Sequence, residues 1–101
     1  MNPENTPSPQ VKPLGPAVEV PVYNCIVLVG PGDSGGVRAR VANLAGIETT
    51  ARTEREALQQ LIPAFKQRLS DLRTNGESIP WLDPPSPADA GEQQRLIAVH
   101  L

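Results

Sequence analysis

The sequence has few of the residues that most often build catalytic, metal-binding or disulfide-bonded sites. It holds one cysteine and one histidine in 101 residues. A single cysteine, Cys25, cannot form an intramolecular disulfide, which fits a reducing compartment. Cys25 and His100 together offer two metal ligands, whereas zinc sites take three or four from the protein. We therefore expect no bound metal and no cofactor, with Cys25 as a small core residue.

A basic surplus and long apolar runs are also missing. The formal net charge is −2, which argues against a general binder of nucleic acids or membrane surfaces. No apolar run approaches the roughly 18 residues of a membrane span, and the first residues lack the pattern of a signal peptide. We expect a cytoplasmic protein without membrane contact. Because there is no basic stripe or recognition helix, we also expect no specific DNA binding by this chain alone.

Proline is abundant, and half of the 12 prolines fall in residues 1–21. Proline fixes φ and removes a backbone donor, so this stretch is predicted to be an extended, disordered tail. Residues 22–101 then form one small domain. A domain of this size buries only roughly 60 % of its unfolded surface, so assembly with a copy or a partner would stabilise it.

Four segments are predicted to be strands by their apolar and β-branched residues. Tyr23–Val29 is almost continuously apolar, so we expect it at the centre of the sheet, covered on both faces. Gly30–Gly36 contains four glycines and predicts a turn. The other strands are Val37–Val41, Ile47–Ala51 and Arg95–Leu101.

The apolar spacing becomes helical after Arg52. Thr53 and Glu56 form a capping box, in which hydroxyl and carboxylate each accept from an unpaired amide of the first turn. The helix is predicted to run from Glu54 to Arg73, with Pro63 bending it on the side away from its apolar stripe. That stripe consists of Leu58, Leu61, Ile62, Phe65, Leu69 and Leu72. The fold class is therefore α+β in the order β-β-β-α-β: an antiparallel three-stranded meander, one helix packed on the sheet, and a final strand.

Two motifs resemble a catalytic and a nucleotide-binding sequence, but both are better explained as parts of a turn. Gly32–Gly36 resembles the segment around the nucleophilic serine of trypsin-like proteases, but that chemistry needs a histidine base and an orienting aspartate. Gly30–Gly35 matches G-x-G-x-x-G, but it leads into a strand, whereas the dinucleotide fingerprint opens a helix. Two-metal RNA cleavage needs carboxylates converging at strand ends, and Tyr23–Val29 and Arg95–Leu101 contain none. We expect a protein that is not an enzyme.

Binding to a protein partner is the remaining class of function. One helix covers one sheet face, so the other face, which carries Leu28, is expected to be covered by a second copy. Ile47–Ala51 is a predicted edge strand that a partner strand could extend. The candidate partner-binding residues are Ile47 and Thr49, Arg38 and Arg40, and Trp81 as an anchor. The alternatives are that Trp81 folds back over the sheet edge and that the two arginines form an ordinary exposed face.

One stretch carries a family resemblance. Gly36–Leu58 reads GVRARVANLAGIETTARTEREAL and resembles the core of HicB-type antitoxins, which run from a glycine into a strand, a leucine–glycine turn, a threonine-rich strand and a threonine-capped helix. The resemblance spans about Tyr23–Leu101. It implies a partial ribonuclease-H-like fold without nuclease activity that neutralises a HicA-like RNA-cleaving toxin by binding it. Many members add a C-terminal DNA-binding segment, which this sequence is not expected to have. A homo-oligomeric module of the same fold with no toxin partner is the second hypothesis.

Overall fold

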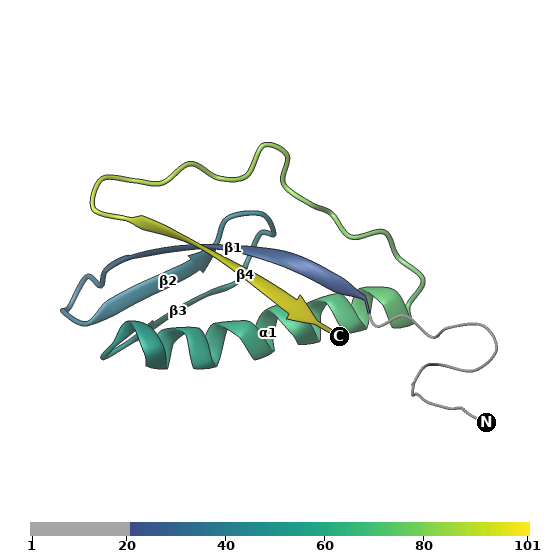
Figure 1. Ribbon diagram of the computed structural model, residues 1–101, viewed down its shortest axis with the longest axis horizontal. Coiled ribbons are helices and arrows are strands. Elements are labelled where there is room, and N and C mark those ends of the chain that lie inside the picture. The colour runs from purple at the N-terminus through teal and green to yellow at the C-terminus, as the bar shows by residue number, and fades with distance from the viewer. Residues whose placement is uncertain (1–20) are drawn as a thin grey trace, which may run out of the picture.

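The computed structural model describes residues 21–101, so the predicted tail lies, except for Pro21, outside the described residues. A four-stranded antiparallel sheet in the order β3-β2-β1-β4 forms one layer, and α1 lies along one of its faces (Figure 1). The α+β fold in the order β-β-β-α-β is confirmed. The elements are β1 (Val22–Pro31), β2 (Val37–Val41), β3 (Glu48–Ala51), α1 (Glu54–Thr74) and β4 (Gln93–His100).

The predicted positions of the elements hold to within one or two residues. β1 pairs with both β2 and β4, which confirms its central place in the sheet. β4 begins at Gln93, two residues before the predicted start. Gln93 and Gln94 are polar and exposed, and so they carry no apolar signal, although they pair with β1.

The core lies between α1 and the β1 face that carries the odd-numbered residues. Cys25 and Val27 are fully buried there against the buried side chains of Leu61, Phe65 and Leu69. This arrangement confirms the helical stripe and the structural role of Cys25. Two stripe residues remain half-exposed, namely Leu58 and Ile62.

The start of α1 is capped almost as predicted. The Thr53 hydroxyl accepts from the Glu56 N–H at 3.1 Å. The Glu56 carboxylate accepts from the N–H of Arg52 at 3.3 Å, not from Thr53. The reciprocal half of the cap is therefore displaced by one residue along the chain. Pro63 is exposed within α1, on the side away from the core.

The expectation that a second copy covers the Leu28 face needs correction. The segment between α1 and β4 crosses that face on the side opposite α1 (Figure 1). Its Leu82 N–H donates to the Asn43 carbonyl at 3.0 Å, and its Ser86 N–H donates to the Ala42 carbonyl at 2.8 Å. Leu28 is 1 % exposed as a result. The sequence pattern missed this cover because an irregular, proline-rich segment has no periodicity that shows where it packs.

Candidate functional site

The glycine-rich motif lies in the turn between β1 and β2. Gly36 has φ +72°, and a Cβ there would lie 2.5 Å from the Ala51 carbonyl oxygen. The backbone conformation at position 36 therefore requires glycine. The histidine is also far from Ser34, because His100 pairs with Val22 at the opposite end of β1. The structure does not bring together the residues of a serine nucleophile site.

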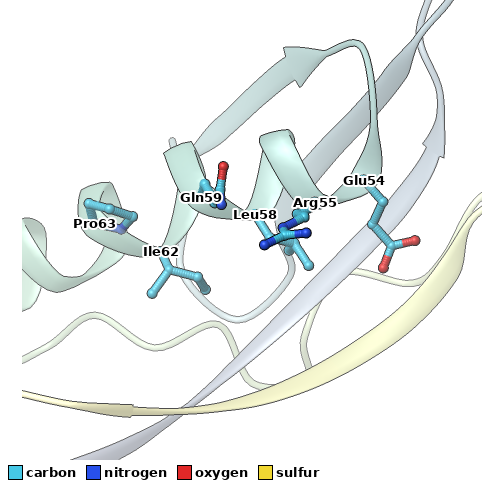
Figure 2. A pocket seen from close by; sticks show the side chains of 6 residues that line it. All are labelled: Glu54, Arg55, Leu58, Gln59, Ile62 and Pro63. Atoms are coloured by element: carbon cyan, nitrogen blue, oxygen red, sulfur yellow. The ribbon is translucent and has the colours of Figure 1, made fainter.

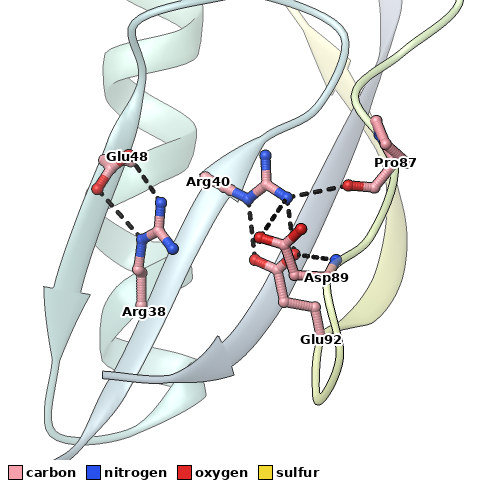
Figure 3. A network of polar contacts seen from close by, with 6 residues as sticks. All are labelled: Arg38, Arg40, Glu48, Pro87, Asp89 and Glu92. Carbon is pink, nitrogen blue, oxygen red and sulfur yellow. Dashed lines mark hydrogen bonds and ion pairs between the residues drawn. The ribbon is translucent and has the colours of Figure 1, made fainter. Parts of the chain in front are cut away.

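The two candidate arginines point to the sheet face opposite α1, and both are engaged within the chain (Figure 3). Arg38 donates two bonds of 3.2 Å to Glu48. Arg40 donates to both carboxylate oxygens of Glu92, at 2.9 and 2.7 Å, and to the carbonyl of Pro87 at 3.0 Å. The Arg40 contacts fasten the crossing segment to β2, whereas Arg38 links β2 to β3; sequence reasoning missed both structural roles.

The ion pair with Glu92 also shifts the pKa values of both side chains. The Arg40 guanidinium lowers the pKa of Glu92 to about 2, and the Asp89 N–H bond to the same carboxylate adds to this effect. The carboxylate in turn raises the pKa of Arg40. The two side chains are only 17 % and 6 % exposed. Arg40 therefore has little capacity for a phosphate or a partner carboxylate.

Trp81 folds back onto the domain. Its ring lies 6.0 Å from that of Tyr23 and 6.2 Å from that of Phe65, measured between centroids. Tyr23 is near the start of β1, whereas Arg38 pairs with Gly30 near its end. Trp81 remains 39 % exposed, but it and the arginines do not form one surface.

The edge formed by β3 was predicted and is confirmed by the strand order. Ile47 packs against the core, and the Thr49 hydroxyl donates to Gln60 of α1 at 2.7 Å. The Val41 N–H donates to the Ile47 carbonyl. Hydrogen bonding alternates along an antiparallel pair, so the backbone groups of Glu48 and Thr50 point outward at this edge. A hollow of about 390 Å³ lies beside it, lined by Gly46, Ile47, Glu48, Ala64, Gln67, Arg68 and Asp71.

The opposite edge, formed by β4, was not singled out from the sequence. β4 pairs with β1 over all eight of its residues, and no strand of residues 21–101 pairs with its other side. The Leu101 N–H donates to the Pro21 carbonyl at 3.1 Å. By the same alternation, the backbone groups that point outward belong to the even-numbered residues Gln94, Leu96, Ala98 and His100.

A groove runs along the flank of α1 that faces β4 (Figure 2). It has a volume of about 740 Å³. The ion pair between Arg95 of β4 and Glu54 of α1, at 2.9 Å, bridges the helix and the strand there. Half-exposed Leu58 and Ile62 supply its apolar wall. The β4 edge is thus bordered by a hollow with apolar side chains on the α1 side of the sheet.

Comparison with models of protein families, with curated proteins and with solved structures finds no match to this chain. Within residues 21–101, no three histidine, cysteine, aspartate or glutamate side chains cluster in a way that could hold a metal ion. No helix in the same range is long and apolar enough to cross a membrane.

Proposed function

We propose that the protein is a non-catalytic binding protein that neutralises a HicA-like RNA-cleaving toxin by direct contact. The family is suggested by the resemblance of Gly36–Leu58 to HicB-type antitoxins. The observation that carries the proposal is the β3 edge, where Glu48 and Thr50 offer backbone groups next to a hollow. A strand of the toxin would pair with this edge and thereby cover the toxin's RNA-binding surface.

The surroundings of the β3 edge are of mixed charge, with Arg68 lining the same hollow, and their exposed carboxylates offer contacts to basic side chains of a partner. Glu48 is 57 % exposed although it pairs with Arg38, and Asp71 lies across the hollow on α1. Exposed carboxylates next to outward backbone acceptors attract arginine and lysine side chains, which RNA-cleaving proteins use to hold phosphates. Such contacts speed association and select the partner more than they add affinity.

Co-expression tests this proposal. A HicA-like toxin encoded beside the gene is expected to arrest bacterial growth alone, and the wild-type chain is expected to restore growth and to co-purify with the toxin. Thr50→Pro removes an outward N–H but no sheet hydrogen bond, and Asp71→Lys reverses a charge beside the hollow. The double variant should keep the wild-type melting temperature and lose rescue.

Asp83→Lys is the matched control, because it makes the same charge change in the segment that crosses the opposite face. It should rescue as well as wild type. Rescue by the Thr50→Pro, Asp71→Lys double variant would show that the β3 edge is not the contact. An arresting toxin that the wild-type chain neither rescues nor binds would overturn the proposed function itself.

The second candidate is the orphan module that assembles with copies of itself. The exposed apolar side chains at β4 favour self-association, with or without a toxin.

A further inference from the structure

The β4 edge lacks most of the features that normally keep sheet edges from pairing. Proteins protect edges by keeping them short and by placing lysines, prolines or inward-pointing charges on them. β4 has eight residues, QQRLIAVH, with no proline, lysine or carboxylate. Its one charged residue, Arg95, points to the α1 side, where Glu54 pairs with it. β3, by comparison, has four residues and starts with a charged one. Of the two edges, β4 is the longer and the less protected against strand pairing.

Apolar side chains border this edge on both faces of the sheet. On the face away from α1, Leu96 is 65 % exposed and Val22 is 52 % exposed. Ile26 pairs with Leu96, and exposed Ala98 follows it along β4 on the same face. On the other face lies the groove with Leu58 and Ile62. Exposed apolar surface that wraps around an unpaired strand is typical of an interface between proteins.

We propose that β4 pairs with β4 of a second copy, antiparallel across a two-fold axis at Ile97, so that two chains share one eight-stranded sheet. Only this register pairs all four outward-pointing residues: Leu96 lies opposite Ala98, and Gln94 lies opposite His100. A two-fold axis at Leu96 or at Ala98 would leave one of the four without a partner. Because a two-fold interface uses the same patch twice, each of these pairs forms twice.

The charges of β4 permit this register. Arg95 would lie opposite Val99 of the second copy, and its own charge is already paired with Glu54. The two Arg95 side chains would be four residues apart along the seam between the two β4 strands. At 3.3 Å per residue this is about 13 Å. No like charges face each other, and Leu96 packs against apolar neighbours from both copies.

The area corresponds to a small, reversible dimer interface. Eight residues of strand span about 26 Å. Packed sheets lie about 10 Å apart, and taking this full depth on each face gives an edge at most about 20 Å deep, so each copy contributes at most roughly 500 Å². The total of at most about 1,000 Å² lies in the range of weak, transient interfaces. The dimer is therefore expected to form reversibly, at micromolar concentration, without a toxin.

Sedimentation or light scattering over about 1 to 200 micromolar tests the proposal. This range brackets the micromolar dissociation constant that we expect for a small interface. The mass should rise to twice the 10.8 kDa of one chain. Leu96→Glu places a charge in the seam, and Ala98→Pro removes an outward N–H while keeping every sheet bond. Each should raise the dissociation constant at least about tenfold. Thr50→Pro at the β3 edge is the control and should leave the dimer intact.

A cysteine scan fixes the register. At the two-fold axis the two copies of residue 97 form a non-hydrogen-bonded pair with Cα atoms about 4.5 Å apart, which is within the reach of a disulfide. Ile97→Cys should therefore cross-link under mild oxidation, Leu96→Cys should not, and buried Cys25 should not contribute. A single-chain mass over the whole concentration range would overturn the proposal. So would a dimer that Leu96→Glu and Ala98→Pro leave unchanged.

Discussion

The bond between Arg40 and Glu92 makes stability depend on pH in a specific window. In the folded chain the Glu92 pKa falls from 4.5 to about 2, chiefly because of the Arg40 hydrogen bonds. A carboxyl whose pKa is lowered by folding stabilises the protein above its unfolded pKa and loses that contribution as pH falls. We therefore expect stability to fall between about pH 4.5 and pH 2, and Glu92→Gln to remove this part of the pH dependence.

The magnitude follows from the two pKa values. Each pKa unit corresponds to about 1.4 kcal/mol, so a fall from 4.5 to about 2 is worth roughly 3 kcal/mol. The two side chains are largely buried, so screening by solvent reduces this only modestly. Protonation of Glu92 should lower the free energy of unfolding by about 2 kcal/mol between pH 7 and pH 3. With a urea dependence of about 1 kcal/mol per molar for a small domain, the urea midpoint of wild type should fall by about 2 M more than that of Glu92→Gln.

Urea unfolding at pH 7 and pH 3 provides the measurement. Trp81 is the single tryptophan and packs on Tyr23 and Phe65, so its fluorescence reports on the core. Glu77→Gln, an exposed position without a side-chain partner among the described hydrogen bonds, is the control and should behave as wild type. Equal falls in the midpoints of wild type and Glu92→Gln would refute the assignment of this carboxyl as the acid-sensitive link.

Three further outcomes test the fold. Leu61 is 1 % exposed in the core, so Leu61→Asp should cost more than about 3 kcal/mol and unfold the domain, as circular dichroism would show; an unchanged melting curve would contradict the placement of α1. Gly36→Ala forces a Cβ to 2.5 Å from the Ala51 oxygen at positive φ and should lower stability by about 1 to 3 kcal/mol, whereas Gly35→Ala, which meets no atom within 4 Å, should cost less. Burial raises the pKa of the Cys25 thiol to about 12, so a thiol reagent at pH 8 should label it only after urea unfolding; rapid labelling of the folded protein would contradict its burial.

Most of the fold was open to sequence reasoning because its elements carry periodic signals. The stripe through Leu61, Phe65 and Leu69 has helical spacing, and Thr53 marks the start of α1 by its capping chemistry. The apolar run of β1 predicts a central strand, which its two neighbours confirm. These signals are local, so a single sequence reveals them.

The surfaces were less predictable because they depend on contacts between distant residues. Arg40 meets Glu92 across 52 positions, and a charged residue on a strand gives no sign of such a partner. The segment that covers Leu28 is irregular, so its packing has no sequence period. Whether β4 lies at an unpaired edge depends on the strand order. That order follows only from where the chain returns to the sheet after α1. Leu96 could have been noticed as an apolar residue on the same strand face as Gln94 and His100.

The two proposed interfaces use opposite ends of the sheet and are compatible. Pairing of two β4 strands places the β3 strands at the outer ends of the eight-stranded sheet, where both stay accessible. A dimer should therefore bind two toxin molecules without dissociating, and the complex should have a two-to-two composition by light scattering. The Leu96→Glu variant should still bind toxin, in a one-to-one complex, because the β3 edge is intact. If wild type instead forms one-to-one complexes and loses its dimer on adding toxin, both partners compete for β4, and the assignment of the toxin to β3 is wrong.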